Sequence, residues 1–350
     1  MRTVVGTMTG TSMDGVDAVA VNINGTALEM TASFISMRSK GLGPTQKILR
    51  KLTQGSGTQE EIDEAASALG RISKEAIEAL QLLKIDLIAL HGQTIFHQPP
   101  KSIQLIDVKP MTIAFDCDIL TDPRQQDLQL GGQGAPITPL ADWIMFRDSN
   151  ASTAIVNLGG FCNVTILPAA SIPPDIRGFD VCCCNLLLNA IALHAYDIEF
   201  DAGGEHALRG KPNVAITQTL LDMLTEQRDS KHSLGTDDDI GALVIEIGNS
   251  MKPEDLLASA AIAIGECITQ SVDGIERVFL AGGGVHNKVL LNAIRHDGTT
   301  ESLGVPTQAR EGMAMAILGA LAQDGISITL PQITGRSESM DVVGWTQASP

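Results

Sequence analysis

A pattern of strand, glycine-containing turn and returning strand occurs twice in this chain of 350 residues. In the first copy, the apolar runs Thr3–Met8 and Val16–Ile23 flank the turn. In the second copy, residues 154–158 and 164–167 flank Gly159-Gly160. Short apolar runs on either side of such a turn predict β-hairpins. Two widely separated hairpins of this kind predict two similar α/β domains that face one another.

The residues after the first hairpin add the helix and the parallel strand that an α/β domain needs. Apolar residues recur at helical spacing over Glu60–Leu83, and Thr58 with Glu61 has the pattern of a capping box at its start. Leu87–Leu90 is a short apolar run typical of a buried parallel strand. Residues 121–140, rich in Gly, Pro, Gln and Asp, predict a long irregular connection.

Later helical patterns at residues 186–195 and 256–270 fit the crossover helices that join parallel strands. We therefore expect an N-terminal α/β domain over residues 1–150 and a second α/β domain over residues 151–309. The C-terminal segment, about 310–350, is expected to pack back on the first domain.

Composition excludes several classes of function. The net charge of −17 leaves no broad basic face for nucleic acid, and aromatic residues, at 3%, are few for base stacking. Six cysteines are too few for a disulfide framework, and Asp14 and Asp17 interrupt the apolar start, which is therefore not a membrane span. We expect a cytoplasmic protein without nucleic-acid or membrane partners, with a homodimer as one alternative for its oligomeric state.

The turn Gly10–Gly15 has the composition of an anion-binding site. Glycines let main-chain amides approach an anion closely, and Thr11 and Ser12 add hydroxyl donors. A carboxylate beside a phosphate needs a cation between them, so Asp14 is expected to hold Mg²⁺, directly or through water. The alternative is a simple hairpin turn with a solvated aspartate. The turn is not a Walker loop, because no Gly-Lys-Ser/Thr follows it.

Gly282–Gly284 stands at the end of a second apolar run, before a helical pattern. Such a loop can hold the phosphates or ribose of a nucleotide at a helix N-terminus, or it can serve close packing alone. With Gly159-Gly160 and the first turn, it makes three glycine-rich strand ends. Three such turns in a two-domain chain favour a nucleotide-binding cleft.

Gly178-Phe179-Asp180 is expected on a loop before a helix. There the aspartate could be a general base, a metal ligand or a helix N-cap, and the local sequence favours the N-cap. Cys182-Cys183-Cys184 follow directly. Three adjacent thiols cannot surround one tetrahedral ion well, which favours structural thiols over a metal or redox site.

The segments 91–94 and 122–136 gather polar side chains around Gly and Pro. Donors and acceptors on loops suit a hydroxyl-rich sugar, although a histidine at a strand end is more often a structural hydrogen-bond partner. Arg124 either binds an anionic group or pairs with Asp122 or Asp127.

In combination, these segments resemble the anhydro-N-acetylmuramic acid kinase family, part of the sugar kinase, heat-shock and actin ATPase superfamily. The resemblance runs from Val4 to Gly335 and rests on the order and spacing of its motifs. They are GTSMDGVDAV (10–19), HGQT (91–94), DPRQQDLQLGGQGAP (122–136), VNLGG (156–160), GFD (178–180) with Asn185, AGGG (281–284) with Asn287, and EGMA (311–314). The resemblance implies two ribonuclease-H-like, actin-like ATPase domains that face an interdomain cleft with ATP.

The resemblance also implies a role for each matching position. Asp180 stands where the family has its general base, and Asp14 would hold Mg²⁺. The nucleotide would be bound by Gly10, Thr11, Ser12, Met13, Asp14, Gly15, Val16, Asp17, Gly159, Gly160, Gly282, Gly283, Gly284 and Asn287. The sugar would contact His91, Gln93, Thr94, Arg124, Gln133, Asn185 and Glu311.

The implied activity is that of an ATP-dependent kinase of a 1,6-anhydro sugar, anhydro-N-acetylmuramic acid first, in cell-wall recycling. Asp180 would deprotonate a water that opens the anhydro bridge, and the released 6-oxygen would accept the γ-phosphoryl group. The chain departs from the family at Val181–Cys184, where Thr-Gly-Pro-Gly is usual, and at Asn189 and Gln308, where Asp is common. These departures leave open a kinase of another anhydro sugar or a hexose, and a catalytically silent nucleotide- and sugar-binding homologue.

Overall fold

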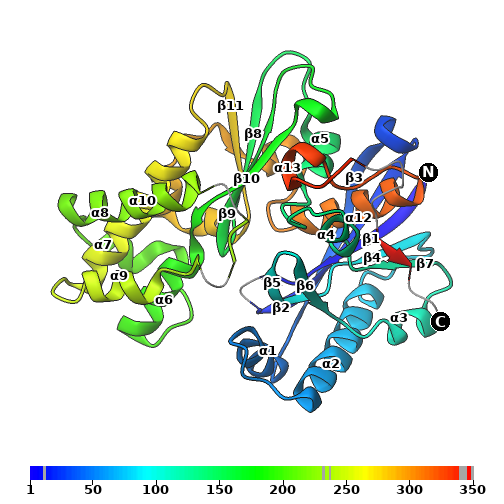
Figure 1. Ribbon diagram of the computed structural model, residues 1–350, viewed down its shortest axis with the longest axis horizontal. Helices are drawn as coiled ribbons and strands as arrows, with labels where there is room; N and C mark the ends of the chain where they lie inside the picture. Colours follow the sequence, from blue (N-terminus) through cyan, green and yellow to red (C-terminus); the bar gives the residue numbers. More distant parts are fainter. Residues whose placement is uncertain (11–12, 231–232, 236–237, 339–344, 348–350) are drawn as a thin grey trace. The chain divides into compact units, whose positions relative to one another are not determined.

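The computed structural model describes residues 1–10, 13–230, 233–235, 238–338 and 345–347 (Figure 1). The chain divides into two compact units. The first unit comprises Met1–Arg147, Ser171–Ile176 and Gly304–Pro350, and the second comprises Asp148–Ala170 and Arg177–Leu303.

The first unit is built on a six-stranded sheet in the order β13-β7-β4-β1-β2-β3. Its strands are β1 (Arg2–Met8), β2 (Gly15–Asn24), β3 (Thr31–Gly41), β4 (Leu87–Leu90), β7 (Asp118–Thr121) and β13 (Thr346–Gln347). β1, β2 and β3 form an antiparallel meander, whereas β4 runs parallel to β1, and β7 parallel to β4. Because β1, β4 and β7 point the same way, their carboxyl ends lie at one edge of the sheet.

The predicted first hairpin and the strand at Leu87–Leu90 are confirmed, and both faces of this sheet are covered by helices. Val5 and Ile88 pack with residues of α2 (Gln59–Glu78) in one hydrophobic cluster. Their neighbours Gly6 and Ala89 instead meet α12 (Arg310–Gln323). Successive strand residues point to opposite faces, so α2 and α12 cover opposite sides of the sheet. This double coverage explains why the strands are almost uniformly apolar.

The contact of α12 with β1 and β2 depends on two glycines. A Cβ on Gly312 would lie 2.3 Å from Cγ2 of Val19, and a Cβ on Gly6 would lie 2.1 Å from the carbonyl oxygen of Gly312. Real side chains do not tolerate such separations. The helix backbone therefore approaches the strand as closely as main-chain atoms allow.

The predicted capping box is present at the start of α2. The side chain of Thr58 accepts from the Glu61 N–H at 3.2 Å, and the Glu61 carboxylate accepts from the Thr58 N–H at 2.8 Å. α2 ends at Glu78, before the predicted end at Leu83. The other helices of this unit are α1 (Thr45–Thr53), α3 (Lys109–Ala114), α4 (Gln125–Gln129), α5 (Pro139–Phe146), α13 (Pro331–Thr334) and the 3₁₀ turns Ala27–Glu29 and Pro173–Asp175.

The expectation of a long irregular connection over 121–140 is wrong in part. α4 lies inside this stretch, and α5 begins before its end. Pro139 stands in the first turn of α5, where a missing N–H costs no hydrogen bond. A separate two-stranded sheet, β5 (Gln93–Gln98) with β6 (Lys101–Leu105), precedes this region.

The second unit has a five-stranded sheet in the order β10-β9-β8-β11-β12. Its strands are β8 (Thr153–Leu158), β9 (Phe161–Leu167), β10 (Arg177–Cys183), β11 (Arg277–Ala281) and β12 (Gly298–Thr299). β8, β9 and β10 form an antiparallel meander, and β11 and β12 continue parallel to β8. Numbered along the chain within each sheet, the strands lie side by side in the order 3-2-1-4-5 in both units. The first sheet has β13 as an additional strand at its edge. This is the ribonuclease-H-like topology, so the predicted fold class is confirmed.

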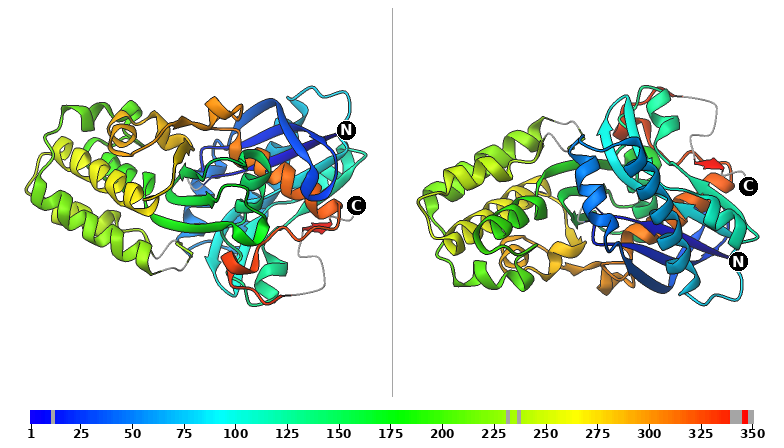
Figure 2. Two further views of the ribbon diagram at one scale, coloured as in Figure 1. Left: turned by 90° about the horizontal axis from the view of Figure 1, so that it is seen from above. Right: turned by 90° about the horizontal axis from the view of Figure 1, so that it is seen from below.

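The helices of the second unit include the two that the sequence predicts. The two predicted helices are α6 (Asn185–Tyr196) and α10 (Pro253–Ser271). The described part of this unit also contains α7 (Glu205–Arg209), α8 (Val214–Asp229), α9 (Gly241–Ile247), α11 (Lys288–Ala293) and the 3₁₀ turns Ala202–Gly204, Gly283–His286 and Thr300–Leu303. α8 and α10 lie side by side in every view (Figures 1 and 2). Among the described residues, no helix combines the length and the apolar character that crossing a membrane requires.

Candidate active site

The carboxyl edge of the first sheet carries three of the predicted segments. Gly10 follows β1, His91 follows β4, and Arg124 follows β7. Ligands of open α/β sheets bind outside the carboxyl ends of the strands. The Thr9 hydroxyl donates to the Gly92 carbonyl at 2.7 Å, which ties the first two loops together. The topology thus gathers the predicted phosphate turn and two predicted sugar-binding residues at one edge.

The turn between β1 and β2 is shaped by its main chain. The Met13 N–H donates to the carbonyl of Gly10 at 3.1 Å, and Met13 has a left-handed φ of 52°. A Cβ on Gly15 would lie 2.9 Å from a carbonyl oxygen of β3, so glycine suits this position. Thr11 and Ser12, the predicted hydroxyl donors, lie outside the described residues.

Two carboxylates flank the end of this turn. Asp14 is exposed, whereas Asp17 is half-buried on β2 and accepts a hydrogen bond from the Ser39 hydroxyl. Burial raises the pKa of Asp17, the Ser39 hydrogen bond lowers it, and the charge of Asp14 raises it further. Val16, between the two, packs into the core with its side chain 1% exposed. The two neighbouring carboxylates are oxygen donors of the kind that Mg²⁺ prefers.

His91 is 1% exposed and has a hydrogen-bond partner at each ring nitrogen. Its Nδ1 lies 2.9 Å from the carbonyl oxygen of Gly92, so this nitrogen carries the proton. Its Nε2 then accepts from Nη2 of Arg124 at 3.0 Å. Burial, followed by the charge of Arg124, lowers the pKa of His91 to about 3. A neutral His91 therefore orients the guanidinium of Arg124.

Arg124 makes a second hydrogen bond, from Nη1 to the carbonyl of Gly134 at 2.6 Å. Of its two aspartate candidates, Asp127 bonds to the N–H of Gly134 and to Thr334 instead. Burial raises the pKa of Asp122, and a main-chain hydrogen bond and the charge of Arg124 oppose that rise. The guanidinium is thus fixed between the loop after α4 and His91.

Gln93 and Thr94, expected on a loop, open strand β5 instead. Their side chains are hydrogen-bonded within the hairpin. Nε2 of Gln93 donates to the Thr94 carbonyl at 3.2 Å, and Nε2 of Gln104 donates to the Thr94 hydroxyl at 3.3 Å. Gln133 lies in the loop after α4, where its N–H donates to the Thr334 carbonyl at 2.8 Å. Gln93 and Thr94 lie on a strand and not on a loop because β5 pairs with β6 directly after Gly92.

Glu311 lies in the first turn of α12, beside a buried ion pair that the sequence reasoning missed. Arg310 is 1% exposed, and its Nε donates to Asp142 at 2.9 Å, with a second bond from Nη2. Asp142 is 0% exposed on α5. The pair fixes the start of α12, and so the main chain at Glu311. The available signal was one acid within the apolar segment 139–146.

In the second unit, the glycine turns after β8 and β11 meet. A Cβ on Gly284 would lie 2.6 Å from Cβ of Leu158, and a Cβ on Gly282 would lie 2.8 Å from the Leu158 carbonyl oxygen. Gly283, between them, is exposed, and a Cβ added there would have no neighbouring atom within 4 Å. Because β8 and β11 are parallel, Gly159-Gly160 and Gly282–Gly284 lie at the same carboxyl edge.

Two asparagines stabilise these turns. Nδ2 of Asn185 donates to the Leu158 carbonyl at 2.9 Å, which ties the start of α6 to the end of β8. Oδ1 of Asn287 accepts from the N–H groups of Val289 and Leu290 at 3.1 and 3.2 Å. Asn287 is thus the N-cap of α11.

Asp180 lies within strand β10, and the expectation of a loop with an N-cap aspartate is wrong. The strand continues to Cys183, so Asp180 is too far from α6 to cap it. Its carboxylate accepts from the Leu234 N–H at 2.8 Å and from the Ser233 hydroxyl at 3.3 Å. The pairing with β9 holds Asp180 opposite Asn163, and an irregularity of the ladder follows directly.

The three adjacent cysteines point into the core. Cys182, Cys183 and Cys184 are each 0% exposed and belong to the main hydrophobic cluster of the unit. Burial raises the pKa of Cys183 and Cys184. All six cysteines are free thiols. Within the described ranges, no group of three or more His, Cys, Asp and Glu side chains is arranged to hold a metal ion.

The predicted site residues therefore fall into two groups, one at the carboxyl edge of each sheet or beside it. The first unit carries Gly10, Met13, Asp14, Gly15, Val16, Asp17, His91, Gln93, Thr94, Arg124, Gln133 and Glu311; the second carries Gly159, Gly160, Asp180, Asn185, Gly282, Gly283, Gly284 and Asn287. Two ribonuclease-H-like units, each with a glycine turn at the carboxyl edge of its sheet, define a protein of the actin-like ATPase fold class.

Comparison with known proteins narrows this class to one family. The family model described as "Anhydro-N-acetylmuramic acid kinase" matches residues 2–346, and the chain belongs to that family. It is a carbohydrate kinase. A relative from Salinibacter ruber, named anhydro-N-acetylmuramic acid kinase, is 30% identical over 96% of this chain and 94% of its own. A relative of the same name from Burkholderia cenocepacia is 32% identical over 89% of this chain and 88% of its own.

Proposed function

We propose that this protein converts anhydro-N-acetylmuramic acid, water and ATP into N-acetylmuramic acid 6-phosphate and ADP. The observation that carries the proposal is the family match over residues 2–346, with Asp180 retained in its motif. Two relatives named anhydro-N-acetylmuramic acid kinase, each aligned over most of this chain, support the choice of sugar. A product of this kind belongs to the recycling of cell-wall sugars.

In the proposed reaction, Asp180 removes a proton from a water molecule whose oxygen attacks the anomeric carbon. The bond from that carbon to O6 breaks, and O6 takes the γ-phosphoryl group while the bond from γ-phosphorus to ADP breaks. The water supplies the new hydroxyl at C1 and one proton, which passes from Asp180 to solvent. The hydrogen bond from the Leu234 N–H keeps the carboxylate in a fixed direction, as a general base requires.

The nucleotide is proposed to bind through main-chain amides at the glycine turns Gly10–Gly15, Gly159-Gly160 and Gly282–Gly284. Glycine lets these amides approach phosphate oxygens closely. The exposed Asp14 carboxylate, with Asp17 beside it, fits Mg²⁺ that keeps most of its waters. Bound there, Mg²⁺ would neutralise charge on the β- and γ-phosphates. The hydroxyls of Thr11 and Ser12 remain predicted donors.

The sugar is proposed to contact His91, Gln93, Thr94, Arg124, Gln133, Asn185 and Glu311. Arg124 is suited to the carboxylate of the lactyl group, because a guanidinium makes paired, charge-assisted hydrogen bonds. Its orientation by His91 and Gly134 limits the entropy that binding costs. The thiols of Cys182–Cys184 are buried in the core of their unit. The choice of sugar therefore rests on the family match over residues 2–346.

Replacement of Asp180 by asparagine tests the proposal. Turnover of the anhydro sugar in Asp180→Asn is expected to fall about 100- to 10,000-fold, the usual contribution of a positioned base, while ATP affinity is retained. Product formation is measured by phosphorus NMR and ATP binding by calorimetry. Asp222→Asn, which removes an exposed carboxylate of the same unit, is the matched control.

Parent-like turnover in Asp180→Asn would show that Asp180 is not the base. A panel that includes other anhydro sugars and hexoses tests the substrate separately. A faster reaction with any of them than with anhydro-N-acetylmuramic acid would replace the proposed sugar. We also propose a cytoplasmic location, which six free thiols support because a reducing compartment keeps thiols unpaired.

A further inference from the structure

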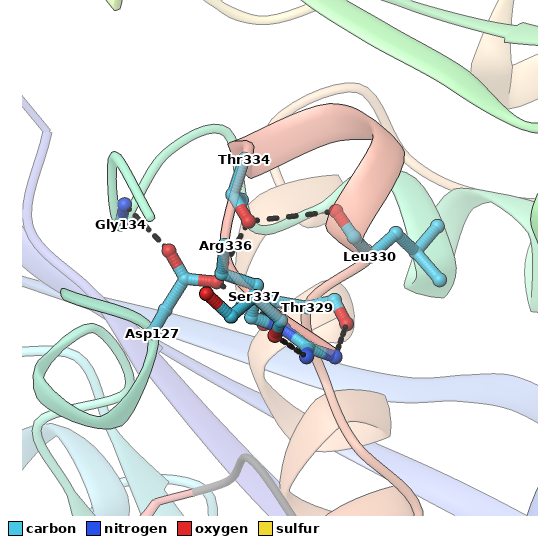
Figure 3. A network of polar contacts seen from close by, with 7 residues as sticks. All are labelled: Asp127, Gly134, Thr329, Leu330, Thr334, Arg336 and Ser337. Atoms are coloured by element: carbon cyan, nitrogen blue, oxygen red, sulfur yellow. Dashed lines mark hydrogen bonds and ion pairs between the residues drawn. The ribbon is translucent and has the colours of Figure 1, made fainter. Parts of the chain in front are cut away.

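Asp127, on α4, is a fully buried carboxylate in the first unit (Figure 3). One of its oxygens accepts from the N–H of Gly134 at 2.8 Å. The other accepts from the hydroxyl of Thr334 at 2.7 Å and lies 3.6 Å from Nε of Arg336. A buried carboxylate with two hydrogen bonds and an opposite charge is held in one orientation.

Arg336 is the charge that compensates Asp127. It is 7% exposed, and its guanidinium donates to the hydroxyl and the carbonyl of Thr329 at 2.9 Å each and to the Ser337 carbonyl at 3.0 Å. Figure 3 shows these side chains around the turn after α13. The C-terminal segment 329–337 thus brings a buried cation and a hydroxyl to an aspartate about 200 residues earlier.

The same segment also holds the loop after α4 by its main chain. The N–H of Gln133 donates to the Thr334 carbonyl at 2.8 Å, and the N–H of Ser337 donates to the Leu130 carbonyl at 2.9 Å. A Cβ on Gly132 would lie 2.1 Å from Oδ2 of Asp127, so the loop backbone contacts the carboxylate directly. The position of this loop is therefore set by the C-terminal segment.

Gly134 connects this arrangement to the predicted sugar site. Its N–H donates to Asp127, and its carbonyl accepts from Nη1 of Arg124 at 2.6 Å. Nη2 of Arg124 in turn donates to Nε2 of His91 at 3.0 Å. A change at the carboxylate of Asp127 thus reaches the guanidinium through one residue, whose φ of 68° leaves little alternative to glycine.

We propose that Asp127, held by Thr334 and Arg336, is a positioning residue that sets the orientation in which Arg124 receives an anionic group of the sugar. This inference rests on the proposed function, in which Arg124 contacts the sugar. Asp127 acts through Gly134 and touches no substrate. Loosening it weakens the sugar complex and its transition state alike, which raises KM for the sugar and leaves kcat and KM for ATP unchanged.

Thr334→Val tests this role, because it removes the hydroxyl that holds Asp127 and keeps the shape of the side chain. The sugar KM is expected to rise about three- to thirtyfold, which lies within the range of coupling between residues of one hydrogen-bond network. Thr334→Ser keeps the hydroxyl and is expected to retain the parent KM. A purely structural role predicts a smaller active fraction instead, seen as a lower kcat at unchanged KM.

The same substitution in an Arg124→Ala background completes the test. There the sugar KM is already high, and Thr334→Val is expected to raise it no further. An equal rise in both backgrounds overturns the positioning role, and so does an unchanged KM for Thr334→Val in the parent. If Arg124→Ala leaves the sugar KM unchanged, the inference falls while the Asp180 test of the proposed function still stands. If the parent protein shows no turnover of anhydro-N-acetylmuramic acid with ATP, the proposed function itself is refuted.

Discussion

The two units share one strand order and use it differently. In the first unit, charged side chains are buried and paired, as in Arg310 with Asp142 and Arg336 with Asp127. At the edge of the second sheet, glycine turns pack directly on Leu158. The topology determines where loops gather. The residues in those loops determine whether the site is stabilised by charge pairing or by close contact of main chains.

This contrast has a physical consequence. A site that depends on buried ion pairs is sensitive to the loss of one charge, because the other is left without compensation. A site that depends on absent side chains is sensitive to added volume. The buried ion pairs of the first unit should therefore respond most to charge changes and pH, and the glycine turns of the second unit to a single added methyl group.

The largest effect is expected for Arg310→Met in the first unit. The substitution leaves the Asp142 carboxylate buried without its guanidinium, which should lower the free energy of unfolding by about 3–5 kcal/mol. Urea denaturation measures the loss. The double variant Asp142→Leu/Arg310→Met removes both charges and is expected to recover much of the stability. A double variant no more stable than Arg310→Met would refute the charge explanation for this unit.

A smaller effect is expected for Gly284→Ala in the second unit. The new Cβ would lie 2.6 Å from Cβ of Leu158 and 3.0 Å from Oδ1 of Asn185. Such overpacking typically lowers the free energy of unfolding by about 1–3 kcal/mol. Gly283→Ala is the matched control, because nothing lies within 4 Å of its added Cβ. Equal stabilities of the two variants in thermal denaturation would show that the turn is not closely packed.

The smallest effect concerns pH and His91. Its folded-state pKa of about 3 lies below the unfolded value, so the unfolded chain binds the extra proton as pH falls below about 6.5. The contribution of His91 to stability is therefore complete well above that pH and decreases as pH falls through it, by about 0.7 kcal/mol between pH 7 and pH 6.

The variant His91→Gln, which cannot titrate, should show a shallower loss of stability over this interval in urea denaturation. The pKa of His97 is lowered to about 4 by burial and, to a smaller extent, by the charge of Arg124. His97 therefore keeps its own contribution to the pH dependence of stability in this variant. An identical pH dependence in parent and variant would mean that His91 is not held neutral in the folded protein. It would also weaken the contrast between a charge-dependent and a packing-dependent unit.

Much of the fold could be predicted because its signals are local. Apolar runs around glycine turns predict both hairpins, and Thr58 with Glu61 predicts the start of α2. The sequence does not predict the β5–β6 hairpin, since Lys101–Leu105 alternates polar and apolar residues without a strong apolar run. Nor does it predict α4, because five residues are too few for a helical period to appear.

The sequence alone determined the repeated strand–turn–strand pattern, the fold class and the family, because these depend on residue types at fixed spacing along the chain. Only the tertiary structure decided that Asp180 lies on a strand, that His91 bears its proton on Nδ1, and that Asp127 is paired with Arg336. These facts concern partners brought together by folding, as with Asp127 and Thr334, which are 207 residues apart. A local pattern states what a side chain can bond to, and the packed chain selects which partner it meets.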